Sequence, residues 1–279
     1  MRLPKLRTLL LVPVVLLVLA YAAIAIRVAT YDNVAPDADG PLIAPRTIAI
    51  FGASGTAGDG ILKATLANPD VGIIRVFTRR TTPRIDAGVA AGKIEMTIHM
   101  DYLDYTAISE QLADVDAVFW AIGLSALGVD EETYRRIHVE FPRRFVAAWA
   151  DVSTLPATSF HYISSSDISE DSRAMWARVK VDAENTLFDF ATGSPMRVIA
   201  YRPDYIGPTD EEAHLGQDIL YAIFKPVGAA VKAEQIGRAM LEVTARGEEF
   251  RNGDKLSTWR IIRYSDAYDR RRNAGTSMP

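Results

Sequence analysis

The 279-residue chain contains no cysteine and only four histidines. The lack of thiols excludes disulfides, zinc–thiolate sites, iron–sulfur clusters and cysteine nucleophiles, although a thiol-free protein is tolerated on either side of a membrane. The histidines show no H-x-x-x-H spacing, and this scatter favours core or surface roles for His99, His138, His161 and His214. The sequence therefore predicts no metal site.

Acidic residues outnumber basic ones outside the N-terminus. The net charge is −4, but residues 1–30 hold four basic side chains and no acid, namely Arg2, Lys5, Arg7 and Arg27. The remaining chain therefore carries a net charge of −8, four units below the total. An acidic body disfavours a nucleic-acid partner, because phosphate binding relies on clustered lysine and arginine.

The composition is that of a globular protein. Hydrophobic residues make up 49% of the chain and charged residues 24%, with 18 glycines and 14 prolines. These values exclude a disordered, collagen-like or coiled-coil chain. The length suits one α/β domain with an appendage.

A long apolar run forms the appendage. Residues 8–26 contain no charged side chain, and roughly 20 apolar residues span the hydrocarbon core of a bilayer. Pro13 lies inside the run, where a membrane helix tolerates it. Ala23-Ile24-Ala25 matches a cleavage pattern, so a signal peptide is an alternative, as is a buried core helix. We favour a single membrane anchor over residues 1–27, which makes the lipid bilayer a partner through residues 8–26.

Segments rich in turn-forming or charged residues flank the predicted domain. Residues 28–45 are rich in proline, glycine and aspartate without periodicity, so they are predicted to be a linker that lifts the domain from the bilayer. The domain then covers residues 46–279. Near its end, the basic cluster at residues 270–272 is predicted to lie on a solvated tail.

A glycine-rich turn follows the first predicted strand. Residues 48–51 are β-rich, residues 52–58 read GASGTAG, and residues 61–66 have helical spacing. A strand, a glycine turn and a helix in this order typically bind a dinucleotide, because glycines let the backbone approach a pyrophosphate at the helix N-terminus. The predicted cofactor-binding residues here are Gly52, Ser54, Gly55, Thr56 and Gly58.

The end of the second predicted strand indicates which dinucleotide is bound. Residues 73–77 form this strand, and Thr78, Arg79 and Arg80 follow it. An acid at this position would hold the ribose 2′-hydroxyl of NAD, whereas arginines suit a 2′-phosphate. NADP(H) is therefore predicted in preference to NAD(H), with Arg79 and Arg80 as binding residues.

Further strands alternate with helical segments. Strands are predicted at residues 94–100, 117–123, 159–163 and 198–201, and helices at 131–149 and 233–246. This alternation predicts an α/β fold with a doubly wound parallel sheet, Rossmann-like, in addition to the N-terminal transmembrane helix.

The motifs together resemble a known superfamily. Four motifs occur in the order found in extended and atypical short-chain dehydrogenases/reductases. They are the GxxGxxG spacing, the serines at Ser164 and Ser165, the helix from Trp176 through Lys180 to Glu184, and Arg202-Pro203. Within this superfamily the chain is most similar to the atypical NAD(P)-binding group related to the tumour-suppressor oxidoreductase and to nitrogen-regulator-like sensors. The resemblance covers about residues 46–245.

This resemblance implies roles for several residues. Ser164 and Ser165 would polarise the substrate oxygen, and Lys180 would hold the ribose and lower the pKa of a catalytic tyrosine. The other implied positions are Asp101 and Tyr102 near the adenine, Ala121 and Gly123 beside the cofactor, and Tyr205 at the nicotinamide and substrate. Residues 209–230 would form a substrate lid, whose apolar residues Ile219, Leu220, Ile223 and Phe224 suggest a lipophilic substrate or else belong to the core.

Trp176 stands where the superfamily has its tyrosine. An indole N–H only donates, so Trp176 cannot act as general acid or base. Three hypotheses follow: the protein binds the dinucleotide without chemistry, as a sensor or scaffold; Tyr162 or Tyr205 supplies the proton; or water relays it through Ser164 and Lys180. We favour an oxidoreductase acting on a small or lipophilic carbonyl or alcohol. The oligomeric state is not predicted.

The orientation in the membrane stays open. The basic N-terminus, followed by the acidic residues of segment 28–45, places the domain outside the cytoplasm by the positive-inside rule. A nicotinamide cofactor points instead to the cytoplasm.

Overall fold

The computed structural model describes residues 6–275, so Arg2 and Lys5 of the predicted basic N-terminus lie outside the described residues. The strands of the main sheet are all parallel and stand in the order β3-β2-β1-β4-β5-β6-β9. Their bounds are β1 Thr47–Phe51, β2 Ile73–Thr78, β3 Ile94–Ile98, β4 Ala117–Trp120, β5 Thr158–Ile163, β6 Met196–Arg202 and β9 Asp254–Ser257. The predicted α/β, doubly wound, Rossmann-like fold is confirmed.

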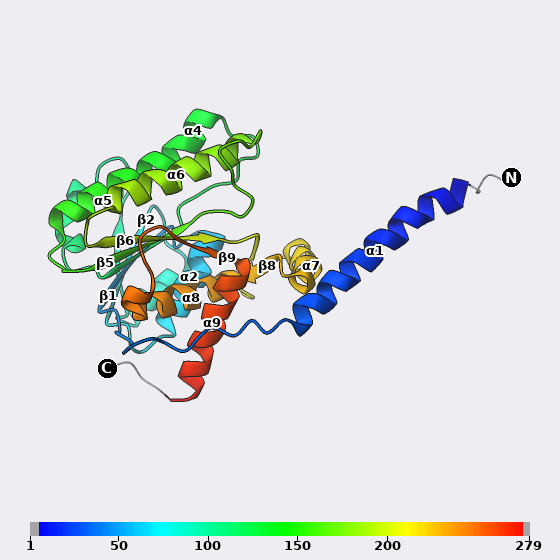
Figure 1. Ribbon diagram of the computed structural model, residues 1–279. Helices are drawn as coiled ribbons and strands as arrows, with labels where there is room; N and C mark the ends of the chain where they lie inside the picture. The colour runs from blue at the N-terminus through cyan, green and yellow to red at the C-terminus, as the bar shows by residue number, and fades with distance from the viewer. Residues whose placement is uncertain (1–5, 276–279) are drawn as a thin grey trace.

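Helices cover both faces of this sheet (Figure 1). Side chains on one face pack against α2, α8 and α9, and those on the other face pack against α5, α6 and the short helix η1. The bounds are α2 Thr56–Leu66, α3 Pro83–Ala90, η1 Thr106–Leu112, α4 Glu131–Arg135, η2 Arg136–Glu140, α5 Phe141–Val152, α6 Met175–Ala191, α8 Ala233–Ala245, η4 Gly247–Glu249 and α9 Thr258–Asn273.

The central strand β1 shows how the two layers are built. Each of its residues is buried, because β2 and β4 pair with its two edges. Successive side chains point to opposite faces. Ile48 and Ile50 therefore join the layer of α2 and α8, whereas Phe51 joins the other layer and stacks on Phe77 with ring centroids 4.9 Å apart.

A smaller unit lies between the main sheet and the N-terminal helix. Strands β7 Tyr205–Gly207 and β8 Ala230–Lys232 form a parallel pair, and helices α7 Leu215–Phe224 and η3 Lys225–Val227 connect them. In Figure 1 this unit lies at the end of the domain nearest to α1. It occupies most of segment 209–230, which the resemblance implies as a substrate lid.

Helix α1 Leu6–Thr30 extends away from the domain (Figure 1). Its residues Leu11–Thr30 have a mean hydropathy of 2.5, and none of this window is buried against the rest of the protein. By length and composition α1 could cross a membrane. A signal sequence near the N-terminus would have the same length and composition.

The structure differs from the sequence expectations at strand ends and at the edge of the sheet. The strands predicted to reach Met100 and Gly123 end at Ile98 and Trp120, because the chain leaves the sheet there. Strand β9 was not predicted, since its sequence Asp254-Lys255-Leu256-Ser257 has only one apolar residue. Leu256 is the only buried residue of this strand, so little apolar sequence marks it.

Segment 28–45 is held against the domain rather than free. The side chain of Asn33 donates to the carbonyl of Trp259 at 3.0 Å, and Arg263 donates to the carbonyl of Val34 at 2.7 Å. Further along, the amide of Ile43 donates to the carbonyl of Ala245 at 2.9 Å. These contacts fix the segment along α9, so it does not act as a loose spacer.

The basic cluster at residues 270–272 is also part of the fold, not a solvated tail. It forms the last turn of α9, where Arg271 pairs with Glu242 at 3.1 Å and Arg272 pairs with Asp70 at 2.9 Å. Glu242 is 1% exposed and also pairs with Arg246. The arginines thus neutralise the buried Glu242 of α8 and Asp70 in the loop after α2.

Candidate functional site

Two adjoining cavities lie at the carboxyl edge of the main sheet. The first, of about 530 Å³, lies beside the ends of β1 and β2, and we call it the glycine cavity. The second, of about 470 Å³, lies beside the ends of β4 and β5, and we call it the lysine cavity. Both are lined by Gly55, Ala121, Ile122 and Gly123, so the two form one continuous groove.

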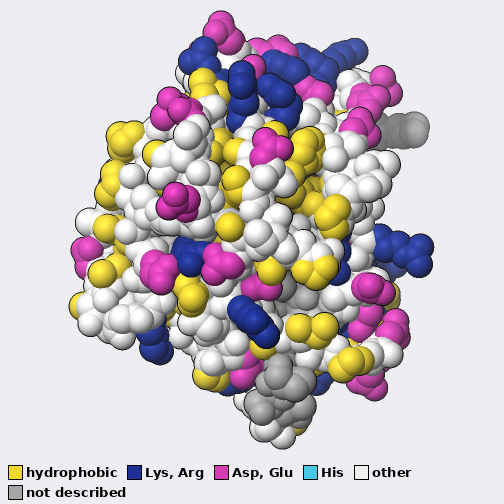
Figure 2. Space-filling model, turned by 90° about the vertical axis from the view of Figure 1, so that its left-hand side faces the viewer, with side chains coloured by type: hydrophobic (Ala, Val, Ile, Leu, Met, Phe, Trp, Pro, Cys, Tyr) yellow, Lys and Arg dark blue, Asp and Glu magenta, His cyan; other side chains and the backbone are white. Residues whose placement is uncertain are grey.

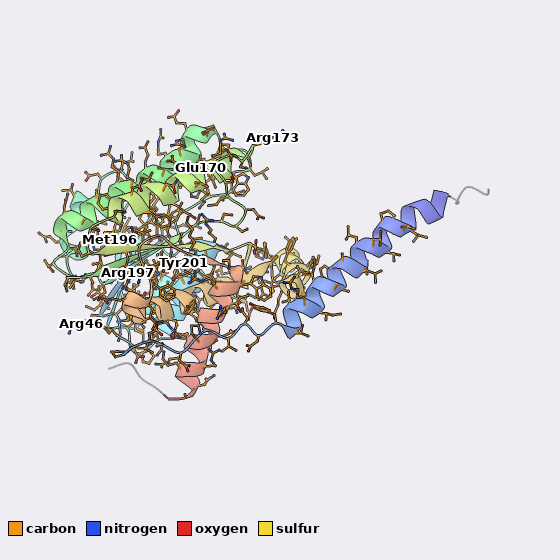
Figure 3. The ribbon with its side chains drawn as sticks, in the orientation of Figure 1. Arg46, Glu170, Arg173, Met196, Arg197 and Tyr201 are labelled. Carbon is orange, nitrogen blue, oxygen red and sulfur yellow. The ribbon has the colours of Figure 1, made fainter. Side chains whose placement is uncertain are left out.

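The groove faces the side of the domain from which α1 extends. In Figure 3, Arg46 and Arg197, at the amino ends of β1 and β6, lie at the far end of the domain. Glu170 and Arg173, in the loop after β5, lie toward the side of α1 (Figure 3). Ligands of open α/β sheets bind at the carboxyl ends of the strands, which is where this groove lies.

The glycine turn brings three backbone segments into close contact. Gly52 has φ +83°, and a Cβ on it would lie 2.6 Å from the carbonyl carbon of Ala121. A Cβ on Gly58 would lie 2.0 Å from the carbonyl oxygen of Gly52, so this glycine packs α2 against the turn and does not line the groove. Gly55 is the N-cap residue of α2 and has no capping side chain, which leaves the first N–H groups of the helix directed at the groove.

Ser54, Arg79 and Arg80, which the sequence predicts as cofactor-binding residues, line the glycine cavity. The Arg80 guanidinium donates to the carbonyl of Ser54 at 3.3 Å, and the Arg79 guanidinium lies 5.9 Å from the ring centre of Tyr102. Among the described residues, no acidic side chain lines this cavity. The cavity therefore presents positive charge beside free helix N–H groups.

Tyr102 and Asp101, which the resemblance places near the adenine, have different positions. Tyr102 is buried and lines the glycine cavity, and burial raises the pKa of its hydroxyl. Asp101 is exposed and does not line it; its carboxylate accepts from the amide of Leu103 at 2.9 Å within a turn. The structure thus brings Tyr102, and not Asp101, to the groove.

The lysine cavity brings together the predicted catalytic residues. Ser164 and Ser165 follow β5, and Trp176 and Lys180 lie one turn apart on α6; all four side chains line the cavity, as does Thr56. Ser164 is 6% exposed, and its Oγ has no hydrogen-bond partner within the described residues. An unpartnered buried hydroxyl is costly, so this atom is positioned for a ligand.

Lys180 is buried beside this serine. Its Nζ donates to the carbonyl of Ile163 at 3.1 Å and to the hydroxyl of Tyr162 at 3.5 Å. Burial lowers the pKa of Lys180 to about 7, although the carboxylate of Glu184 opposes this shift. Glu184 is itself paired with Arg202 at 2.5 Å, which limits its effect on the lysine. Lys180 therefore titrates near neutral pH.

Tyr162 and Tyr205, the two tyrosines considered as proton sources, differ in access. Tyr162 is fully buried, donates to the carbonyl of His138 at 3.2 Å and does not line the groove; burial raises its pKa well above 10.0. Tyr205 lines the lysine cavity, and its hydroxyl donates to the carbonyl of Gln217 at 3.4 Å. Tyr162 thus supports Lys180, whereas Tyr205 faces the ligand space.

Sequence reasoning missed His138 and Tyr134, which also line the lysine cavity. Their rings lie 4.2 Å apart, and His138 Nε2 lies 3.4 Å from the amide of Leu124. Burial, together with the positive charge of Lys180, lowers the pKa of His138 to about 3, so its ring stays neutral. His138 lies in η2, a π-helical turn, and such turns are frequent at functional sites.

Comparisons with known proteins show the fold. No protein-family model matches the chain, and no curated protein matches it significantly. The similar solved structures include a 3-oxoacyl-[acyl-carrier protein] reductase from Brucella melitensis, with TM-score 0.60 and 14% identity over 78% of this chain and 97% of that one. A mutant short-chain dehydrogenase/reductase from Serratia marcescens gives TM-score 0.60 and 16% identity over 78% and 97% of the two chains.

A third similar structure is larger than this chain's domain. The UDP-glucuronic acid 4-epimerase from Bacillus cereus, in complex with NAD, gives TM-score 0.58 and 14% identity over 76% of this chain and 77% of that one. At these identities the comparison concerns the backbone arrangement. The domain therefore has the Rossmann-type fold found in short-chain dehydrogenases/reductases.

Proposed function

We propose that the protein is a membrane-anchored oxidoreductase of the short-chain dehydrogenase/reductase type, which uses NADP(H) and acts on a small or lipophilic carbonyl or alcohol. The observation that carries this proposal is the unpartnered, buried Ser164 Oγ in a cavity that also holds Lys180. That cavity continues into a groove that begins at a glycine turn. A substrate oxygen and a dinucleotide would thus meet at one place.

The residues of the groove fit a dinucleotide. Gly52 and Gly55 leave room for a pyrophosphate, and the uncapped N-terminus of α2 supplies N–H donors. The superfamily's bound cofactor supplies or accepts a hydride. The chain's own residues would hold it: the glycine turn would bind the phosphates, Tyr102 would line the adenine end, and Lys180 would lie toward the ribose.

The proton for the substrate oxygen comes, in this proposal, from Lys180. In the direction of reduction, Ser164 Oγ donates a hydrogen bond to the carbonyl oxygen, and the Lys180 ammonium transfers its proton to that oxygen as the hydroxyl forms. The neutral amine that remains is stable because the site is buried and the pKa of Lys180 is about 7. A general acid works best with a pKa near the working pH, so Lys180 takes the role that Trp176 cannot fill.

Helix α1 supports membrane anchoring in this proposal. Its apolar window Leu11–Thr30 is long enough to span a bilayer, and no part of this window is buried against the domain. The orientation is left to experiment, because the positive-inside rule and the location of NADP(H) point to opposite sides.

Preference for NADP(H) is tested by removing the arginines of the glycine cavity. Arg80→Ala, and separately Arg79→Ala, should weaken NADPH binding by about 10- to 100-fold, since each charge-assisted hydrogen bond is worth about 1.5–3 kcal/mol. NADH affinity should change less than about threefold, because NADH lacks the 2′-phosphate. Fluorescence titration of the full-length protein measures both.

The matched control is Arg144→Ala, which removes the same charge from an exposed position on α5. It should leave both affinities unchanged. An equal loss of NADH and NADPH affinity in the Arg80 variant would contradict the 2′-phosphate assignment. Absence of binding of either nucleotide to the unaltered protein would overturn the whole proposal.

Trp176→Tyr tests whether the protein catalyses at all. The unaltered protein should reduce members of a panel of aldehydes and ketones with NADPH, and the variant should be faster by about 10- to 100-fold, since a positioned general acid typically contributes 10²–10⁴-fold. Tyrosine at position 176 lies one helical turn from Lys180, whose charge would favour its phenolate. Activity gained only in the variant would instead identify the natural protein as a silent NAD(P)-binding sensor or scaffold.

A further inference from the structure

Helix α7 is an apolar helix that the protein leaves uncovered. None of its residues is buried, and Leu215 is 78% exposed, Ile219 51% and Ile223 48%. At about 100° per residue these three side chains and Leu220 fall on one half of the helix, and Phe224 lies at its edge, with its ring centre 5.9 Å from that of Tyr205. A helix in water places its apolar half against a core, so the exposed half of α7 requires another apolar environment.

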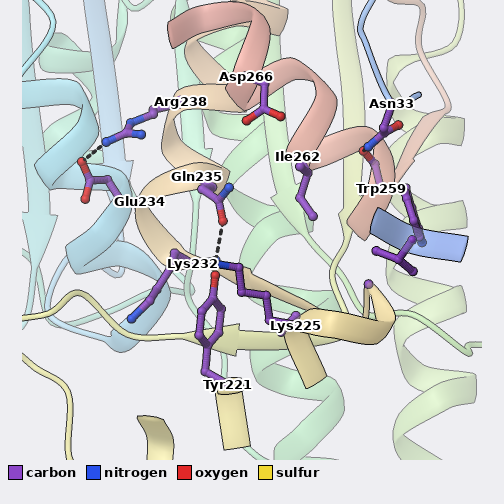
Figure 4. A pocket seen from close by; sticks show the side chains of 13 residues that line it. Asn33, Tyr221, Lys225, Lys232, Glu234, Gln235, Arg238, Trp259, Ile262 and Asp266 are labelled. Atoms are coloured by element: carbon purple, nitrogen blue, oxygen red, sulfur yellow. Dashed lines mark hydrogen bonds and ion pairs between the residues drawn. The ribbon is translucent and has the colours of Figure 1, made fainter. Parts of the chain in front are cut away.

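Two polar side chains of α7, Gln217 and Tyr221, face the domain, where each lines a cavity. Gln217 lines the lysine cavity, and Tyr221 lies between two cations, with Lys232 Nζ 4.7 Å and Lys225 Nζ 5.7 Å from its ring centre. In Figure 4 the tyrosine stands beside Lys232 at the wall of a separate cavity of about 530 Å³. These contacts hold α7 to the domain and direct its apolar half outward.

The end of α7 lies beside the predicted membrane span. The Tyr21 hydroxyl, on α1, donates to the carbonyl of Ile223 at 2.8 Å. Ile26 is the last residue of the uncharged run. At about 1.5 Å of rise per residue, Tyr21 lies about 7 Å along the helix axis inside this end of the run. Interfacial helices lie about 5–10 Å inside the boundary between headgroups and acyl chains, so α7 is at the depth of such a helix.

Basic side chains surround the base of α1 at the level expected for headgroups. A cavity of about 510 Å³ between α1 and α9 is lined by Arg27, Arg260 and Arg263, and by the aromatic pair Tyr31 and Trp259. Among the described residues, no acidic side chain lines it. Arginine and aromatic side chains are the residues that lie at a membrane surface.

The opposite end of the domain has a different surface. Figure 2 shows the end far from α1, where Lys and Arg side chains and Asp and Glu side chains are interspersed with scattered hydrophobic ones. The apolar helix, the arginine-lined cavity and the anchor therefore all lie on one side of the molecule.

From this arrangement we infer that α7 lies in the interface of the bilayer and docks the carboxyl edge of the sheet against the lipid. The inference rests on the proposed membrane anchor. Its partner is a lipid surface, with the apolar half of α7 among the upper acyl chains and the arginines at anionic headgroups. Because Gln217 of the same helix lines the lysine cavity, the cavity wall is then in contact with the membrane.

The absence of cysteine makes a direct test simple. Three single-cysteine variants of the full-length protein are labelled with an environment-sensitive fluorophore: Ile219→Cys on α7, Leu16→Cys on α1, and Asp151→Cys, an exposed residue of α5. Each is reconstituted in vesicles of phosphatidylcholine and phosphatidylglycerol that carry a spin-labelled lipid quencher, either high or low along the acyl chain.

The label at position 219 should be quenched about threefold or more by the shallow quencher and less by the deep one, as an interfacial depth requires. The label at position 16 should respond most to the deep quencher, and that at position 151 to neither. If position 16 is quenched while position 219 behaves like position 151, the inference is overturned and the anchor stands. If position 16 is not quenched, both the anchor and the inference fail, whereas dinucleotide binding is tested independently.

Discussion

Replacing Lys180 with methionine is expected to lower turnover by about 10²–10⁴-fold, the usual contribution of a positioned general acid. Methionine keeps much of the buried apolar volume but cannot transfer a proton. Carbonyl reduction by the full-length protein with saturating NADPH measures the loss. Turnover of the unaltered protein should fall as pH rises through about 7, because the ammonium form of Lys180 is then lost.

Lys180→Arg separates proton transfer from a purely electrostatic role. Arginine keeps the positive charge but does not deprotonate in proteins, so it can hold a ribose yet cannot deliver a proton. We expect NADPH affinity to survive in this variant while turnover is lost. Restoration of turnover by arginine would contradict the proposed proton transfer and would leave Lys180 as a positioning residue.

The same lysine makes stability depend on pH. Its pKa is about 7 in the folded protein and 10.5 ordinarily, so between these values the unfolded chain binds more protons than the folded one. The free energy of unfolding, relative to that of Lys180→Met, should therefore rise as pH increases from about 7 to 10.5. The full difference is about 5 kcal/mol at most, at about 1.4 kcal/mol per pH unit. Thermal unfolding of both proteins across this range measures it, and a flat difference would contradict a buried lysine.

The layout of the fold could largely be predicted because its signals are local. Runs such as residues 48–51 and 117–120 are buried on both sides of a parallel sheet, and such strands read as continuous apolar sequence. Strand β9 carries no such signal, since Leu256 is its only buried residue. The same limit applies to residues 270–272: their partners Asp70 and Glu242 lie far away in the sequence, so nothing near the arginines indicates an ion pair.

The candidate site, too, could be predicted from the sequence only in part. Gly52, Arg80 and Ser164 each follow a strand, and parallel strands bring their carboxyl ends to one edge, so a shared groove could be expected. The place of His138 depends on the rotation of a helix that contains a π-helical turn, which no spacing rule describes. Asp101 follows a strand as well, but its carboxylate is taken up by its own turn. Position at a strand end is thus necessary for these residues but does not fix where the side chain points.

Gly58→Ala should destabilise the protein strongly. The new Cβ would lie 2.0 Å from the carbonyl oxygen of Gly52 and 2.8 Å from Cα of Ala53, so backbone rather than a side chain would have to move. Overpacking of this kind costs about 3 kcal/mol or more, which corresponds to a fall in Tm of about 6–12 °C. NADPH binding should be lost too, because α2 can no longer present its N-terminus to the groove.

Gly55→Ala is the matched comparison, because it adds the same methyl group three residues earlier. Its Cβ would lie 3.5 Å from the carbonyl oxygen of Gly52, an ordinary contact, and its φ of −103° suits any residue. Stability should therefore fall by no more than about 1 kcal/mol. The methyl group would nevertheless enter the groove where the two cavities meet. It would keep the phosphates from approaching the backbone, so NADPH affinity should drop by at least about tenfold. Equal Tm values for the two variants would show that Gly58 does not pack the helix as described, and unchanged affinity in Gly55→Ala would place the pyrophosphate elsewhere.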